Sequence, residues 1–338
     1  MKNEVKRKIK YLIKKRHFIK KSNNPIKWGV IGTGYMANCF CNAIEGSSDG
    51  VLYSVASRDL KKAISFSKDH GSCMYFCGYK NMVNELKNIL DVVYIATPLY
   101  CHFEHISYCL EKGVNVICEK PIVENTEQFE ILEKIAKKNN CFLMEAMWMK
   151  CLPTYTKAKT WLEEGKIGDI KYIRVDFYKK DLFKIKKNES VLKDFGVYAI
   201  AFPIGLIKQN FPLEILYCRN NSVANYDSDW QIILKYSALN VAISISNNFN
   251  SSSKAEVIGC DGSIEWDNQF NRTNKITLYD KDGNIKEKFN AKYSYEGFEY
   301  EVMEVNKSIR MKHKESDLVT LKDTKTVLQI IDFLLEEN

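Results

Sequence analysis

The sequence predicts an α/β protein with an N-terminal doubly wound parallel sheet and a C-terminal α+β domain that carries a large, mostly antiparallel open sheet. Three observations support this fold class. A short apolar run at 26–31 leads through a glycine-rich turn into a helix-like stretch. Short apolar strands then alternate with helix-like segments up to residue 118, which is the order that builds a parallel sheet. Beyond residue 213, apolar runs follow one another with polar turns between them, as in an antiparallel sheet.

The length and composition allow two domains and exclude several other classes of protein. The chain has 338 residues, of which 45% are hydrophobic and 27% are charged. These values are typical of a globular protein large enough to form two cores. No uncharged apolar run approaches the roughly 18 residues that a membrane span needs, and the charged N-terminus does not resemble a secretory signal. We therefore expect a cytoplasmic protein.

The net charge of +8 comes from the N-terminus. Residues 1–27 contain eleven basic residues and one acidic residue, whereas the rest of the chain holds 39 basic and 41 acidic residues. This distribution argues against nucleic acid as a partner, because a nucleic-acid-binding domain spreads its basic residues over a folded face. Residues 1–25 are instead predicted to form a basic arm. The arm could make a weak contact with an anionic membrane surface or an acidic partner, or fold against its own domain or a sister subunit, and we favour the second interpretation.

The eleven cysteines do not predict a metal site. No two of them are three positions apart, as a Cys-x-x-Cys pair of metal ligands would be. Cys39 and Cys41, like Cys73 and Cys77, are interpreted as small buried hydrophobic residues in a reducing compartment. No metal is expected.

The turn after the first predicted strand has the residues of a nucleotide-binding loop. Its first glycine permits a tight turn, its second lets a pyrophosphate approach the backbone, and a small residue allows close contact between helix and strand. The free amides at the start of the following helix would face the phosphates. Alone, such a pattern is also compatible with a purely structural turn. The candidate cofactor-binding residues here are Gly32, Thr33, Gly34, Tyr35, Met36 and Ala37.

The second strand, predicted at 51–56, is followed by Ser57 and Arg58. In a Rossmann fold this position contacts the adenosine ribose. An acidic side chain there accepts from the 2′-hydroxyl of NAD, whereas an arginine accommodates the 2′-phosphate of NADP. We interpret Asp59 as the N-cap of the next helix. The sequence therefore favours NADP over NAD.

The alternation continues with helices near 60–69, 80–88 and 101–112 and with strands at 91–96 and 114–118. Ligands of doubly wound sheets bind beyond the carboxyl ends of the strands, so we expect further cofactor contacts there. A lysine at such a strand end can donate a hydrogen bond or lower the pKa of a neighbour, although isolated lysines are more often solvated surface residues. The candidates at these strand ends are Ala96, Thr97, Pro98, His102, Glu119, Lys120 and Pro121.

Together these motifs resemble those of the Gfo/Idh/MocA oxidoreductases. The glycine turn, the Ala-Thr-Pro and Glu-Lys-Pro segments and a run that ends at Trp148 occur in the order and spacing of that family. The chain is most similar to the branch of dihydrodiol dehydrogenases and glucose-fructose oxidoreductases, from about residue 26 to the C-terminus. The resemblance implies a Rossmann dinucleotide-binding domain at 26–148, with Trp148 also near the cofactor. It implies a substrate-binding and oligomerisation domain at 149–338, whose C-terminal helix can pack back on the first domain.

The second domain is expected to begin with a helix at 154–164 and a strand at 169–178. By resemblance, one face of its sheet carries the substrate site and the other is often a subunit interface. Six further runs predict the remaining strands of this sheet, at 213–218, 230–236, 241–246, 255–259, 263–266 and 276–279.

Asp194 and Tyr198 are four positions apart in an apolar, helix-like run, so they would share one face of a helix. In isolation, an N-cap aspartate and a packed tyrosine would be the better explanation of the two residues. The resemblance implies that Tyr198 is the proton donor and that Lys120 supports it, and we assign Asp194 an orienting role. Because a nearby ammonium favours phenolate, we expect Lys120 to lower the pKa of Tyr198. Many relatives are glycine-rich before this motif, whereas residues 188–193 are bulkier here, which leaves the substrate open.

These observations predict an NAD(P)-dependent oxidoreductase that prefers NADP. The enzyme would transfer a hydride between the nicotinamide and a secondary alcohol or ketone of a sugar, a sugar derivative or a cyclic diol. The alternative is a non-catalytic dinucleotide-binding protein with a regulatory or scaffold role, and the joint presence of Lys120 and Tyr198 favours catalysis. A homo-oligomer, either a dimer or a tetramer, is expected.

Overall fold

The computed structural model describes residues 22–180, 190–207, 211–222 and 226–336. The predicted basic arm lies almost wholly outside these residues, as do residues 188 and 189 of the segment that precedes Asp194. Within the described part of the chain, no helix is long and apolar enough to cross a membrane.

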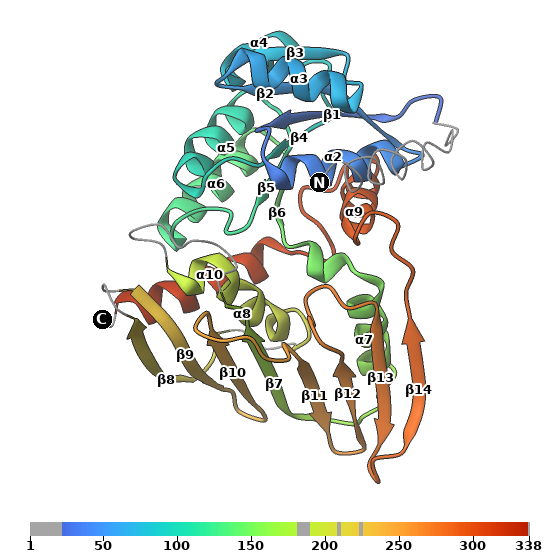
Figure 1. Cartoon of the computed structure of the whole chain (residues 1–338), viewed down its shortest axis with the longest axis vertical. Helices are drawn as coiled ribbons and strands as arrows, with labels where there is room; N and C mark the ends of the chain where they lie inside the picture. The colour runs from blue at the N-terminus through green and yellow to red at the C-terminus, as the bar shows by residue number, and fades with distance from the viewer. Residues whose placement is uncertain (1–21, 181–189, 208–210, 223–225, 337–338) are drawn as a thin grey trace, which may run out of the picture.

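The first domain is built on a six-stranded sheet in the order β3-β2-β1-β4-β5-β6 (Figure 1). Every neighbouring pair of its strands is parallel, so the predicted doubly wound sheet is confirmed. Its central strands are continuous apolar runs because both faces of the sheet are covered, and all of β4 is buried. The strands are β1 (Ile26–Ile31), β2 (Gly50–Ser57), β3 (Met74–Cys77), β4 (Val92–Ile95), β5 (Val116–Glu119) and β6 (Leu143–Ala146).

Helices pack on both faces of this sheet and divide its interior into two cores. Adjacent residues of β1 point to opposite faces: Val30 joins a core with Phe40, and Ile31 joins a core with Ile106. The side chain of Asp59 accepts hydrogen bonds from the backbone amides of Lys61 and Lys62, which confirms its predicted N-cap role. The helices are α2 (Tyr35–Gly46), α3 (Leu60–His70), α4 (Tyr79–Leu86), the 3₁₀ turn η1 (Leu99–Cys101), α5 (His102–Glu111) and α6 (Thr126–Lys138).

The cysteines of the first domain differ in burial. Cys41 is buried and Cys39 is half-buried, as expected for small hydrophobic residues. The expected burial of Cys73 and Cys77 is wrong, because both are exposed. Cys73 precedes β3, and Cys77 is its last residue. Because β3 forms the edge of the sheet, part of its surface faces solvent.

The second domain contains an eight-stranded sheet in the order β14-β13-β12-β11-β7-β10-β9-β8. Its pairs are antiparallel except for β7 with β10, so the prediction of a mostly antiparallel sheet is confirmed. Side chains alternate between a buried and a more exposed face, with Ile173, Val175 and Phe177 of β7 on the buried one. The strands are β7 (Ile170–Tyr178), β8 (Glu214–Ser222), β9 (Tyr226–Lys235), β10 (Asn240–Ser246), β11 (Ala255–Gly259), β12 (Gly262–Trp266), β13 (Lys275–Asp280) and β14 (Ile285–Asn290).

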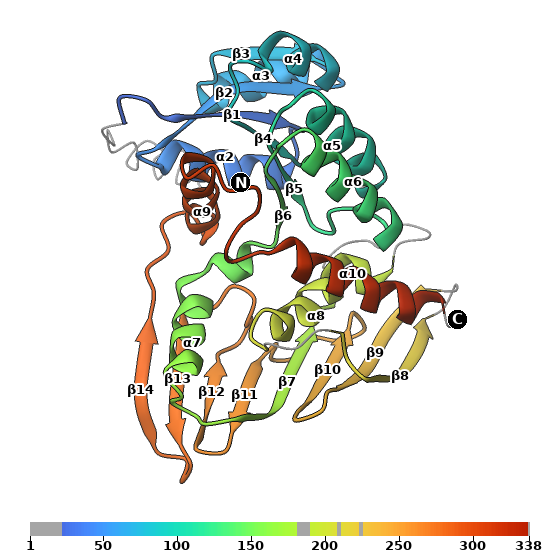
Figure 2. The same ribbon diagram turned by 180° about the vertical axis from the view of Figure 1, so that it is seen from behind.

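Helices lie on one face of this sheet, between it and the first domain, as the two opposite views show (Figures 1 and 2). The 3₁₀ turn η2 (Trp148–Cys151) leads from β6 into α7 (Pro153–Glu163). A π-helical turn, η3 (Leu192–Gly196), continues directly into the apolar helix α8 (Val197–Ile204). The last helix, α10 (Leu321–Glu336), packs against both α8 and α6.

Helix α9 (Phe298–Arg310) follows the second sheet in sequence but packs against α2 of the first domain (Figure 2). The indole nitrogen of Trp28 donates to Oδ1 of Asn306 at 3.0 Å. Arg310 forms an ion pair with Asp49, and its Nε lies 2.6 Å from the carboxylate. The segment after the second sheet thus becomes part of the first domain.

Candidate active site

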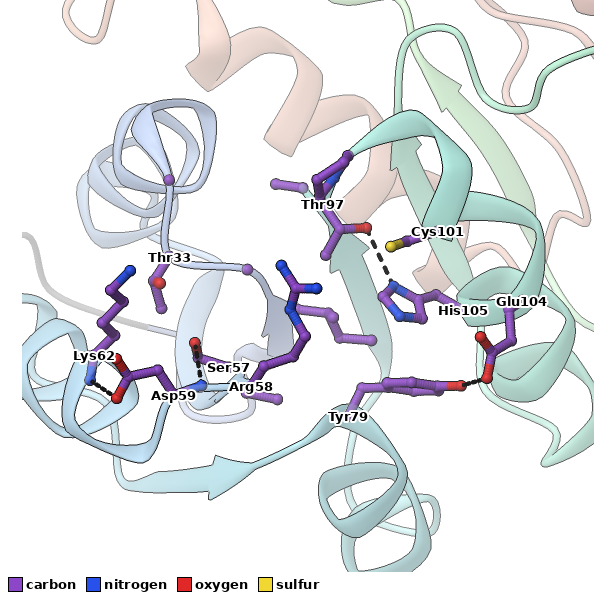
Figure 3. A pocket seen from close by; sticks show the side chains of 16 residues that line it. Thr33, Ser57, Arg58, Asp59, Lys62, Tyr79, Thr97, Cys101, Glu104 and His105 are labelled. Atoms are coloured by element: carbon purple, nitrogen blue, oxygen red, sulfur yellow. Dashed lines mark hydrogen bonds between the residues drawn. The ribbon is translucent and has the colours of Figure 1, made fainter.

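A cavity of about 510 Å³ opens at the carboxyl ends of β1, β2 and β4 (Figure 3). This is where the strand order reverses, because β1 has β2 on one side and β4 on the other. Ligands of doubly wound folds bind at such a switch point. Eight of the predicted cofactor-binding residues line it: Gly32, Thr33, Gly34, Ser57, Arg58, Ala96, Thr97 and Pro98.

The glycine turn leaves room for a phosphate at the start of α2. Gly32 has a φ of 117°, and a side chain there would meet the backbone carbonyl of Ala96. A Cβ on Gly34 would instead have no neighbour within 4 Å. No side chain caps the amides of α2, so they are available to an anion. The turn therefore fits the pyrophosphate of a dinucleotide.

Two cations face the cavity, one just after β2 and one on the first turn of α3. Figure 3 shows Arg58 reaching into its middle and Lys62 extending beside Thr33. Asp59 also lines the cavity, but its Oδ1 accepts from the amides of Lys61 and Lys62 at 2.9 and 3.3 Å. Because that carboxylate caps α3, the positive charges dominate this end of the cavity. Lys62 was not predicted, although its position three residues after the N-cap places it on the first turn of α3.

Apart from Thr97, the opposite wall described here consists of residues that the sequence analysis did not select. Oγ1 of Thr97 lies 3.1 Å from Nδ1 of His105, whose ring is 4.1 Å from that of Tyr79. Tyr79 donates to Glu104 at 2.6 Å. Burial lowers the pKa of His105 to about 4, so its imidazole is neutral at pH 7. Cys101, with Glu104 and His105, lines the cavity because positions three and four apart share one face of a helix.

Seven predicted cofactor residues do not line this cavity: Tyr35, Met36, Ala37, His102, Glu119, Lys120 and Trp148. The buried His102 ring joins two strand-end loops, with Nδ1 2.9 Å from the carbonyl of Pro121 and Nε2 2.8 Å from that of Thr97. The buried carboxyl of Glu119 accepts a hydrogen bond of 2.5 Å from Tyr94. Both side chains therefore hold the strand ends in place through contacts within the protein.

The remaining candidates meet beyond the end of β5. Nζ of Lys120 donates to the backbone carbonyl of Asp194, lies 3.6 Å from its carboxylate, and stands 5.0 Å from the ring centre of Tyr198. The indole of Trp148 donates to the Tyr198 hydroxyl at 3.0 Å. Segments from three separate parts of the sequence thus converge on one phenol. Of the other predicted residues, Tyr35 is exposed, Met36 is half-buried and Ala37 is buried.

The expected lowering of the Tyr198 pKa is wrong. Burial raises this pKa well above its usual value, and the negative charges of Glu119 and Glu301 raise it further, whereas the Trp148 hydrogen bond lowers it. The Lys120 ammonium lies 5.0 Å from the centre of the Tyr198 ring, and the Trp148 indole donates to the hydroxyl. Tyr198 is therefore a neutral phenol at pH 7, which suits a proton donor better than a base.

Comparison with known proteins agrees with this geometry. Residues 26–147 match the model of an oxidoreductase family with an NAD-binding Rossmann fold. The trans-1,2-dihydrobenzene-1,2-diol dehydrogenase of Xenopus tropicalis is 26% identical over 329 residues, which cover 92% of this chain and 97% of the relative. The NADP-dependent scyllo-inositol 2-dehydrogenase IolU of Bacillus subtilis is 27% identical over 274 residues, or 77% of this chain and 81% of the relative.

Solved structures share the whole fold. A levoglucosan dehydrogenase, in complex with NADH and levoglucosan, superposes with a TM-score of 0.82 over 93% of this chain and 97% of its own, at 18% identity. A 3-ketoreductase from Actinomadura kijaniata, in complex with NADP and TDP-benzene, superposes with a TM-score of 0.76. The superposition covers 91% of this chain and 96% of the ketoreductase, at 20% sequence identity.

The fold and the cavity define an oxidoreductase of the class that binds a nicotinamide dinucleotide on a Rossmann domain. Within that class, the chain is similar to the Gfo/Idh/MocA oxidoreductases, whose family model matches residues 26–147.

Proposed function

We propose that this protein is an NAD(P)-dependent oxidoreductase acting on a secondary alcohol or ketone of a sugar, a sugar derivative or a cyclic diol. The observation that carries the proposal is the convergence of Lys120 and Asp194 on Tyr198, beside a cavity that fits a dinucleotide. The names of the relatives support the substrate class, since they refer to a cyclic diol and an inositol.

In this proposal, the nicotinamide supplies or accepts the hydride when it is bound. Tyr198 gives its phenolic proton to the substrate oxygen as the carbonyl carbon gains the hydride, so a ketone becomes an alcohol. In the reverse direction Tyr198 recovers that proton. Trp148 fixes the phenol by donating to its oxygen. Lys120 lies against both Asp194 and the Tyr198 ring, where it can orient the phenol and a substrate oxygen together.

The alternative, a non-catalytic dinucleotide-binding protein, does not account for a lysine, an aspartate and a buried tyrosine gathered at one place. The test is oxidation of NADPH in the presence of keto sugars, cyclic ketones and diones, with the Tyr198→Phe variant in parallel. A substrate that the wild type reduces and the variant does not would support the proposal. Tight NADPH binding without turnover of any member of the panel would favour the alternative.

Arg58→Ala and Lys62→Met should each weaken NADPH binding by about 10- to 100-fold and leave NADH binding nearly unchanged. Both side chains line the end of the cavity nearest the ribose position, and a charge-assisted hydrogen bond to a phosphate is worth about 1.5–3 kcal/mol. Calorimetric titration of both cofactors measures the change. Lys61→Met is the matched control, because Lys61 is the exposed neighbour outside the cavity. Equal wild-type affinities for NADPH and NADH would contradict this assignment.

We also infer a homo-oligomer that forms through the sheet face opposite α7, α8 and α10. On that face Leu216, Ile233 and Ala242 are cross-strand neighbours, and Leu216 is 47% exposed. A self-complementary apolar row of this kind suits a two-fold interface. Leu216→Asp should therefore reduce the mass measured by sedimentation, with unchanged circular dichroism. A wild type that sediments as a monomer would contradict the inference.

A further inference from the structure

The first turn of α10 contacts the supports of two separate parts of the candidate active site. The helix begins after Thr320, whose hydroxyl accepts a hydrogen bond of 3.0 Å from the backbone amide of Asp323. Asp323 and its neighbour Thr324 each contact a buried side chain from the segment that joins the two domains. The contacted side chains are Lys150 and Glu145.

Asp323 supports the helix that carries Tyr198. It pairs with Lys150, which is 2% exposed, at a distance of 2.8 Å. The same ammonium lies at the C-terminal end of α8, where a Cβ on Gly205 would be 3.1 Å from Nζ. A cation is favourable there, because the carbonyl end of a helix carries a partial negative charge. A buried lysine needs a partner, so Asp323 fixes the ammonium on which the end of α8 rests.

Thr324 supports the loop that carries Lys120. Its hydroxyl lies 3.5 Å from Oε2 of Glu145, a residue of β6 that is 3% exposed. The other carboxylate oxygen of Glu145 accepts a hydrogen bond of 3.1 Å from the backbone amide of Ile122. Ile122 follows Lys120 by two residues, just beyond β5. A buried backbone amide needs an acceptor, so Glu145 fixes this loop and Thr324 fixes Glu145.

We propose that the first turn of α10 is a positioning element that sets Lys120 against Tyr198. Asp323 holds the helix of the phenol, and Thr324 holds the loop of the ammonium. Neither side chain lines the cofactor cavity, so both act through the residues that they contact. Their effect on the reaction can still be large, because a misplacement of about 1 Å can cost roughly 10²-fold in rate. This role rests on the proposed function of Tyr198.

Loss of either contact should lower turnover and leave cofactor binding intact. Asp323→Ala and Thr324→Val should each lower kcat by about 10- to 100-fold. Affinity for NADPH should stay within about threefold of the wild-type value, because the cavity is untouched. Asp323→Asn and Thr324→Ser keep the contacting oxygen and should restore most of the rate. Steady-state kinetics and calorimetric titration measure these effects.

Two contacts further along α10 provide the matched controls. Asp332 accepts a hydrogen bond of 2.7 Å from the backbone amide of Thr126, and Lys325 pairs with Glu130 at 2.7 Å. Both contacts tie α10 to α6 and reach neither support of the site. Asp332→Ala and Lys325→Met should therefore leave kcat unchanged, even where they lower the midpoint of denaturant unfolding. Equal losses of kcat in these controls would show that α10 only holds the fold together, and would overturn the proposal.

The second test needs no substrate. A proton beside an aromatic ring has a shifted resonance, so the Cε–H signal of Lys120 in ¹³C-lysine-labelled protein reports its contact with Tyr198. Lys120→Arg identifies this signal, and Tyr198→Leu gives its position without the ring. In Asp323→Ala and Thr324→Val the signal should move toward the Tyr198→Leu position. In Asp332→Ala it should stay at the wild-type position.

The outcomes separate the two proposals. A lower kcat with an unmoved Lys120 signal would overturn the positioning role. A moved signal, in a protein whose wild type reduces no member of the substrate panel, would support the positioning role and overturn the proposed function. If Asp323→Ala does not fold, the double variant Asp323→Ala with Lys150→Met removes the pair without leaving a buried charge. The Lys120 signal should move in that variant too, and an unmoved signal would again overturn the positioning role.

Discussion

Tyr198→Phe is expected to lower turnover by about 10²- to 10⁴-fold, the usual contribution of a general acid or base. The substitution removes only the hydroxyl, in a helix whose other side chains are buried and unchanged. Cofactor affinity should therefore be preserved. The variant also deprives the Trp148 indole of its acceptor, which should cost about 1–3 kcal/mol of stability. Steady-state kinetics and calorimetric titration of NADPH measure these effects.

Lys120→Ala is the partner experiment and should give a comparable loss. Because Lys120 and Tyr198 are in contact and act on one proton transfer, the double variant should be impaired much less than the product of the single losses. Near-normal turnover of Tyr198→Phe, with an unchanged pH profile, would make Tyr198 a packed aromatic. His102 would be a poor substitute as donor, since both of its ring nitrogens face backbone carbonyls.

Gly32→Ala should destabilise the protein by about 3–5 kcal/mol. At a φ of 117° an L-residue is strained, and the new methyl group would meet the carbonyl of Ala96 on the neighbouring strand end, which cannot move without breaking the sheet. Denaturant unfolding of the purified variant, or its failure to accumulate as folded protein, measures the effect.

Gly34→Ala is the control at the same turn and should behave in the opposite way. Its φ of −85° suits any residue, and its Cβ would enter open space. Stability should change by less than about 0.5 kcal/mol. Affinity for NADPH and NADH should fall together, because the methyl group occupies the approach of the pyrophosphate. A stable Gly32→Ala, or a Gly34→Ala with normal affinity, would contradict the assigned roles of the two glycines.

The predicted parts of the fold are those with local signals. The strands of the first domain are continuous apolar runs, and the glycine turn fixes where the first helix begins, so β1, β2, β4 and β5 were predicted close to their observed bounds. The sequence analysis missed β3 and β6, which have four residues each, and β14, whose Ile285–Asn290 run is charged and largely exposed. Such strands owe their existence to a neighbour in the sheet rather than to their own pattern.

The residues of the candidate site also divide into those with a local signal in the sequence and those without one. Arg58 and Lys120 could be selected because they follow strands, and strand ends of a parallel sheet share one edge. Lys62 and His105 required knowledge of which helix faces the cavity. The direction of the Tyr198 pKa shift could not be predicted, because it is set first by burial of the phenol in the folded protein and then by the charges of Glu119 and Glu301, which come from distant segments of the chain. Electrostatics depends on distance in space, which the spacing of motifs does not give.

Helix α9 has a consequence for the order in which the chain can fold. The wall of the first domain formed by α2 and Trp28 is completed by residues 298–310, which are synthesised after all six strands of that domain's sheet. A nascent chain that has finished all six strands of its nucleotide-binding sheet would still expose the Trp28 indole and the Asp49 carboxylate. The first domain therefore reaches its final form only when the second sheet has emerged behind it, which couples the completion of one domain to the completion of the other.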